Sequence, residues 1–168
     1  MPQYYNDEQL TKGLISIMSG VMDSVAQKLK DLLADDAGLI DTIIYQANDP
    51  KAYARQGDSG GLLGMWEKKP LKSSGRGIAY QIYADSDLLS HDPKHFIHGS
   101  NYWEESDDIR DILIDLVVGG GSGDFFGSGF WMGARDFWTP FLEMLEDGTV
   151  NKILESEFKK RGIVYIKV

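Results

Sequence analysis

The sequence predicts an α+β fold in which a small antiparallel sheet packs with a long N-terminal helix and with C-terminal helices. Apolar residues recur at spacings of three and four in the first 34 residues and again in the last third of the chain, which indicates helices. Short apolar or alternating runs lie between these regions and indicate strands. Helices at both ends with few strands between them favour the α+β class.

The first predicted element is a helix over residues 7–34. Asn6 is expected to cap its N-terminus, and the two acidic residues that follow suit the positive end of the helix dipole. Gly13 and Gly20 each cost on the order of 1 kcal/mol relative to alanine, so the helix is expected to depend on tertiary or intersubunit packing. Its apolar stripe consists of Leu10, Leu14, Ile17, Met18, Val21, Met22, Val25, Leu29, Leu32 and Leu33.

The middle of the chain predicts a hairpin. Residues 39–46 fit either a helix or a strand, and a turn follows at residues 48–50. The apolar run at residues 62–66 predicts a short strand, and the polar residues 68–77 predict a connection. Alternation over residues 78–84 predicts a second strand, so the two strands are expected to pair with a long tip between them.

The segment after the hairpin has no clear periodicity and is expected to be a long loop with an aromatic centre. Helical spacing returns over residues 106–118, where acidic residues favour the helix N-terminus, and a run of glycines ends this helix. Six carboxylates and one arginine lie between Glu104 and Asp115, which is typical of a solvated helix face.

Two helices and a strand are expected at the C-terminal end. The first helix should begin near Thr139, with Pro140 at its first position, and should end at Asp147 and Gly148. Thr149 is expected to cap the second helix and Gly162 to end it. Residues 163–168 predict a final strand.

Composition points to a single domain spanning residues 1–168. The chain has 42% hydrophobic and 26% charged residues, close to the averages of globular proteins. Its length suffices for a hydrophobic core that needs no disulfide or metal ion for stability. The absence of cysteine excludes disulfides, cysteine zinc sites and thiol catalysis. The first residues have neither a basic region nor an apolar run, so we expect no cleaved signal and no membrane span.

The net charge of −9 argues against tight nucleic-acid binding through phosphate contacts. The negative charge does not exclude a protein channel for DNA, because acidic side chains that line a channel repel the DNA backbone and let the DNA slide. The resulting hypothesis is that the helix over residues 106–118, or another carboxylate-rich face, borders a channel through which DNA passes.

Few residues in the sequence suggest a catalytic, metal-binding or phosphate-binding site. His91, His95 and His98 have a spacing that can ligate zinc or nickel, but Pro93 interrupts them and no cysteine or HExxH pattern accompanies them. The glycine-rich run has no GxGxxG pattern, and no GxxxxGK[ST] motif occurs in the chain. We therefore expect no catalytic residues, no metal and no cofactor. The alternative is a small-molecule-binding or metal-binding protein, or an enzyme, that uses the histidine loop.

The stretch from Gly119 to Phe141 is the most unusual part of the sequence. Residues 119–131 predict a flexible, glycine-rich arm, whose conformation must be imposed by a surface against which it packs. Seven large aromatic side chains between Phe125 and Phe141 exceed what one small core usually buries. The predicted interface residues are Phe125, Phe126, Phe130, Trp131, Arg135 and Trp138.

Motifs in chain order resemble the tail-completion or head-to-tail joining (neck) proteins of long-tailed bacteriophages. The resemblance covers most of the chain. A tyrosine, a Y-x-R motif and a glycine-leucine strand start are matched in the first half, and an HG motif and an aromatic helix start in the second. The matching residues are Tyr45, Tyr53, Arg55, Gly61, Leu62, His98, Gly99, Arg135, Phe137 and Trp138.

The resemblance implies a structural protein without enzymatic activity. It implies copies of this chain in a ring, as a hexamer or dodecamer, in the virion neck after synthesis in the host cytoplasm. The implied partners are portal or adaptor proteins and a tail terminator or tail tube protein, with DNA passing through the lumen without tight binding and no membrane. A cellular adaptor domain that binds a peptide through the aromatic segment is a further alternative.

Overall fold

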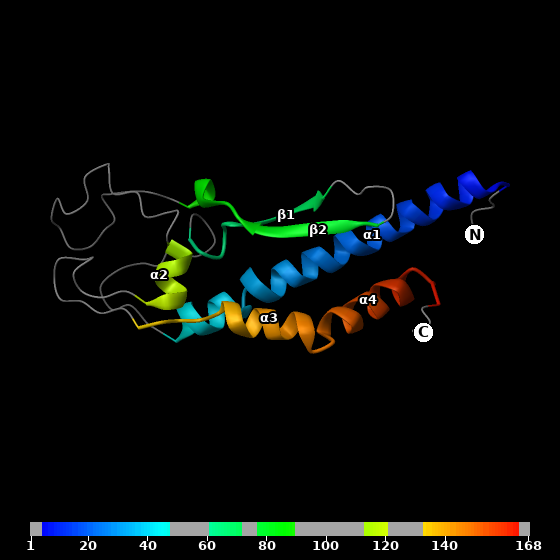
Figure 1. Ribbon diagram of the computed structural model, residues 1–168. Helices are drawn as coiled ribbons and strands as arrows, with labels where there is room; N and C mark the ends of the chain where they lie inside the picture. The colour runs from blue at the N-terminus through cyan, green and yellow to red at the C-terminus, as the bar shows by residue number, and fades with distance from the viewer. Residues whose placement is uncertain (1–4, 48–60, 72–76, 90–112, 121–132, 165–168) are drawn as a thin grey trace. The chain divides into compact units, whose positions relative to one another are not determined.

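The computed structural model describes residues 5–47, 61–71, 77–89, 113–120 and 133–164 (Figure 1). It confirms the α+β class, with a two-stranded antiparallel sheet, a long N-terminal helix and further helices. The chain divides into two compact units. Unit 1 comprises Met1–Lys30, Glu67–Tyr83 and Met144–Val168, and unit 2 comprises Asp31–Trp66 and Ala84–Glu143. The single domain over residues 1–168 stays a prediction.

The N-terminal helix α1 spans Asp7–Ala34, as the apolar periodicity predicted. The predicted cap is also confirmed, because the side-chain oxygen Oδ1 of Asn6 accepts a hydrogen bond from the backbone N–H of Gln9 at 2.8 Å. In return, the Gln9 side chain accepts from the backbone N–H of Tyr5 at 3.0 Å. The bond to Asn6 satisfies one backbone donor that the first helical turn leaves without an intrahelical partner, and the bond from Tyr5 holds the residue before the cap to the helix.

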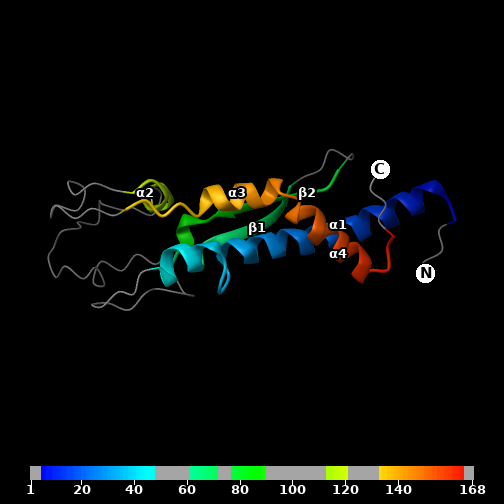
Figure 2. The same cartoon turned by 90° about the horizontal axis from the view of Figure 1, so that it is seen from below.

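The core of unit 1 forms where α1 packs against α4 (Thr149–Lys160), which lies beside it in Figures 1 and 2. Val21 and Val25 from the apolar stripe of α1 are buried against Phe158 of α4. The N-terminal part of the same stripe stays exposed at Leu10 and Leu14. The surrounding, partly buried residues are Met18, Leu29, Val150, Ile153, Leu154 and Ile163.

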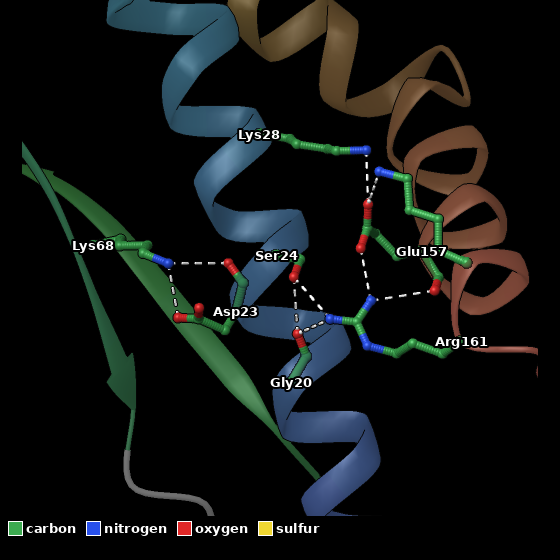
Figure 3. A network of polar contacts seen from close by, with 8 residues as sticks. Gly20, Asp23, Ser24, Lys28, Lys68, Glu157 and Arg161 are labelled. Carbon is green, nitrogen blue, oxygen red and sulfur yellow. Dashed lines mark hydrogen bonds and ion pairs between the residues drawn. The ribbon is translucent and has the colours of Figure 1, made fainter.

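The predicted hairpin is confirmed with a shifted first strand. β1 spans Trp66–Leu71 and β2 spans Ala79–Ala84. The prediction of a strand over residues 62–66 was wrong except at Trp66, because residues 62–65 form turns. Residues 68–70, taken as a connection, belong to β1. The Lys68 side chain extends from β1 toward α1, and its Nζ pairs with Oδ1 of Asp23 at 2.8 Å, so one lysine of this strand packs against the helix (Figure 3).

In unit 2, residues 39–46, for which the sequence allowed either a helix or a strand, are helical. Residues 39 and 40 are helical, and Asp41–Gln46 forms the π-helix η1, which places Ile44 in the core. A short 3₁₀ helix, η2, spans Ser86–Leu88, and α2 spans Leu113–Gly119. Among the described residues of unit 2, the buried apolar ones are Leu33, Ile40, Ile44, Leu62, Met65, Trp66, Leu89, Val117, Phe137 and Phe141.

Two details of the C-terminal helices differ from the predictions. α3 spans Trp138–Glu146, so Pro140 is its third residue and not its first. The residue at the N-cap of α4 is Gly148, with φ of 90° and no side-chain cap bond. The side chain that binds the first turn of α4 belongs to Asp147, whose Oδ1 accepts from the backbone N–H of Thr149 at 2.8 Å. Thr149 was therefore wrongly predicted as the cap.

The structure confirms the prediction that Gly162 ends α4. Gly162 has φ of 68°, in the left-handed region. Its N–H donates to the carbonyl oxygen of Lys159, and the N–H of Ile163 donates to that of Phe158, both at 3.0 Å. These two bonds form a Schellman motif. Ile163 and Val164 lie in no strand, and the rest of the predicted strand lies outside the described residues.

Candidate assembly interface

The predicted arm, residues 119–131, is tied at its base within unit 2. The backbone N–H of Arg135, just before α3, donates to the carbonyl oxygen of Val117 in α2 at 2.8 Å. Gly120, which follows α2, has φ of 76°, a conformation that favours glycine. The Arg135–Val117 bond therefore brings together the two ends of the segment that contains residues 121–132, which themselves lie outside the described residues.

An aromatic cluster lies directly after this base, at the start of α3. The rings of Trp138 and Trp66 stack, with centroids 5.7 Å apart and an interplanar angle of 22°. Phe137 contacts both rings edge-on, and Phe141 lies 5.7 Å from Trp138 between centroids. Phe137 is fully buried, whereas 36% of Trp138 is exposed. The cluster thus anchors the base of the arm in the core of unit 2 and leaves Trp138 partly exposed.

Asp136 fixes the direction in which α3 leaves this base. Its Oδ1 accepts hydrogen bonds from the backbone N–H groups of Trp138 and Thr139, each at 2.9 Å. The side-chain hydrogen bond from Thr139, followed by the backbone N–H bonds, holds the pKa of the Asp136 carboxyl below its ordinary value. An ionised Asp136 therefore caps α3 and orients the two aromatic residues that follow it.

Three residues of the family motif meet in unit 2. The hydroxyl oxygen of Tyr45, on η1, accepts a hydrogen bond from the backbone N–H of Leu62 at 3.1 Å. Gly61 and Leu62 are buried beside this bond. The motif residues therefore hold η1 to the turns before β1, which is a packing role.

The remaining predicted site residues lie outside the described residues. They comprise the aromatic residues of the arm, the Y-x-R and HG parts of the family motif and the histidine cluster. They are Phe125, Phe126, Phe130, Trp131, Tyr53, Arg55, His91, His95, His98 and Gly99. Within the described ranges, no group of three or more histidine, aspartate or glutamate side chains is placed to hold a metal ion. None of the described helices combines the length and apolar character that crossing a membrane requires.

Unit 1 contains a buried carboxylate that the sequence did not single out. Glu157 on α4 has a side chain only 4% exposed, and it pairs with Lys28 of α1 at 2.8 Å, Arg161 at 2.6 Å and Lys160 at 3.0 Å (Figure 3). Arg161 also donates to the carbonyl oxygen of Gly20 and to Oγ of Ser24, each at 2.9 Å. This network ties the end of α4 to α1.

The network holds Glu157 ionised. Hydrogen bonds from Lys28, Arg161 and Lys160, in that order of importance, lower the pKa of Glu157 from its ordinary value of 4.5 to about 2. A carboxylate with this pKa does not exchange protons near neutral pH, and a general acid or base needs a pKa near the working pH. Glu157 therefore serves packing and not proton transfer.

The sequence did not predict which side chains contact the proposed interface residue Trp138. Trp66 and Trp138 lie far apart in the chain, and nothing in the sequence pairs them. Asp136 had a usable signal, because an aspartate two residues before a helix start is a common cap. No family model, curated protein or solved structure matches this chain at a significant level.

Proposed function

We propose that this chain is a structural subunit of a bacteriophage neck. In this role, copies of the chain form a ring, as a hexamer or dodecamer, between the portal or adaptor proteins and the tail terminator or tail tube. DNA passes through the lumen without tight binding. The protein is made in the host cytoplasm and ends in the virion neck, and it has no enzymatic activity.

One observation supports this proposal most. The two ends of the arm are fastened by the Arg135–Val117 backbone bond, and the half-exposed Trp138 lies immediately beside this base. A fastened base lets an arm project toward a neighbour while the domain behind it stays folded. Tryptophan is among the residues enriched at protein interfaces, so the exposed part of Trp138 supports a contact with a neighbour at this base.

The charge of the chain supports the DNA channel. A net charge of −9 disfavours phosphate binding and suits a wall along which DNA slides. In α2, Asp115 is exposed. The proposed channel wall includes the acidic residues 106–118, of which only residues 113–118 are described.

Depletion of the protein from the phage that encodes it tests the proposal. We expect DNA-filled heads and complete tails to accumulate separately, and purified protein added to the mixture should restore joining, as seen by electron microscopy. The control is the same protein with Phe137→Ala, which removes the buried anchor of the arm base. Joined particles in the absence of the protein would exclude the neck role.

A further inference from the structure

The hairpin in Figure 1 has two outer edges, and its register shows which backbone N–H and C=O groups point outward along each edge. β1 and β2 have equal spans, so Trp66 faces Ala84 at one end of the sheet. The N–H of Asp85 donates to the carbonyl oxygen of Met65 at 2.8 Å, which fixes this register. In an antiparallel pair, alternate residues direct their N–H and C=O groups to the partner strand and the residues between them direct theirs away. Even-numbered residues of both strands therefore direct their backbone groups outward.

The outer edge of β1 is protected against further pairing. Pro70 is one of its outward residues and has no N–H to donate. Lys68 is another, and its ammonium pairs with Asp23 of α1, whereas the Lys69 ammonium lies 4.3 Å from the centroid of the Tyr83 ring on β2. Proline and lysine are the residues with which proteins commonly prevent edge strands from pairing.

The outer edge of β2 carries no such protection. Its sequence, AYQIYA, has no charge and no proline, and its tyrosines and isoleucine favour strands. Tyr80, Ile82 and Ala84 direct their N–H and C=O groups outward. The described residues add no third strand to the sheet, and none of their backbone hydrogen bonds outside the sheet involves these three residues. An unprotected edge of this kind is a template for a further strand.

We propose that the outer edge of β2 pairs with β2 of a second copy of this chain. The two strands run antiparallel about a two-fold axis at Ile82, and the two hairpins form one four-stranded sheet. This register pairs all three outward residues and sets Tyr80 opposite Ala84 of the second copy, a large side chain against a small one. The two paired β2 strands themselves contain no charged residue. The protected β1 edges then lie on both outsides of the sheet and stop further growth.

The fold gives an energetic reason for this pairing. The hairpin already packs against α1, where Lys68 pairs with Asp23, and pairing with a second hairpin would add hydrogen bonds from the outward backbone groups of both β2 strands. An isologous contact also closes on itself, so it produces a defined pair and not a fibre. The contact does not depend on the neck role. Combined with a ring contact at the arm, a two-fold contact would join two rings into a dihedral assembly.

Disulfide trapping tests the register. The chain has no cysteine, so a single introduced thiol reports only its own position. In the proposed pair, the two copies of residue 82 lie about 5.5 Å apart between Cα atoms, within disulfide reach. Residue 79 lies about 20 Å from its copy along the strands. We expect Ile82→Cys to form a covalent dimer under mild oxidation and the more exposed Ala79→Cys to stay monomeric. Equal cross-linking of both would overturn the proposal.

A matched proline pair tests the backbone contact. Ala84→Pro removes an outward N–H, whereas Ala79→Pro removes an N–H that pairs with β1. Both are made in the background of Phe125→Ser, Phe126→Ser and Phe130→Ser, which removes the proposed arm contact. We expect the background protein to be a dimer by light scattering, Ala84→Pro to be a folded monomer, and Ala79→Pro to lower the melting temperature. A monomeric background protein, or an Ala84→Pro variant that keeps the dimer mass, would refute the pairing.

Discussion

At the scale of single residues, Glu157 is the charge on which the packing of α4 against α1 depends most. Its carboxylate is buried, yet three cations surround it, one of them from α1. A buried charge is tolerated only when it is paired and hydrogen-bonded, and removing it leaves its partners without compensation. The pairing also raises the pKa of Lys160, mainly through its hydrogen bond to Glu157.

Replacing Glu157 by glutamine should lower the melting temperature by several degrees at pH 7. The difference from the wild type should shrink as pH falls. The ionised form of Glu157 is favoured in the folded chain, so its contribution is complete above the ordinary pKa of 4.5 and is lost as pH falls toward about 2. Thermal denaturation at a series of pH values measures both effects. The control is Glu155→Gln, an exposed position on the same helix, and an equal effect of both variants would contradict the role of Glu157.

Phe137 is the buried centre of the aromatic cluster at the arm base. Phe137→Ala should lower the free energy of unfolding by about 3–5 kcal/mol, because it leaves a cavity beside the stacked rings of Trp66 and Trp138. Leu142→Ala, at an exposed position of α3, should change it far less. Urea denaturation followed by tryptophan fluorescence compares the two. Similar losses in both variants would show that the cluster does not support unit 2.

At the scale of elements, the helices could be predicted better than the segments between them. α1 has ten apolar residues at helical spacing and a side-chain cap, so its bounds were predicted as the structure has them. The run at residues 62–66 is too short for its periodicity to distinguish a strand from a buried turn. The π-helix η1 has no sequence signal of its own. The stacking of Trp66 on Trp138 depends on tertiary folding, which no local pattern reports.

Two glycines of unit 1 should respond oppositely to substitution by alanine. Gly162 has φ of 68°, so an alanine there is strained, and Gly162→Ala should destabilise by about 1 kcal/mol. Gly20 lies inside α1, and a Cβ there would meet only the end of the Arg161 side chain at 4.0 Å. Gly20→Ala should therefore stabilise by up to about 1 kcal/mol. Chemical denaturation measures both, and a destabilising Gly20→Ala would show that α1 needs the glycine for its contact with Arg161.

At the scale of the whole molecule, some contact surfaces of the chain stabilise its fold and others are proposed to bind further copies. The α1–α4 contact and the aromatic cluster are internal, and they explain how each unit keeps its fold. The arm and the β2 edge are the surfaces that we assign to other copies. The arm carries Phe125, Phe126 and Phe130, and burying even part of their area would contribute several kcal/mol at roughly 25 cal/mol per Å². This gain offsets the entropy of ordering a glycine-rich segment.

The mass of the protein in solution, measured by light scattering, tests this account most directly. We predict that the wild type alone assembles to a mass of six or twelve times 18.8 kDa for one ring, or to twice that mass where the β2 edges join two rings. The variant with Phe125, Phe126 and Phe130 all replaced by serine should keep the helical circular dichroism of the wild type and lose the ring. A variant that assembles as the wild type does would place the ring contact elsewhere, and a variant that unfolds would place these aromatic side chains in the core.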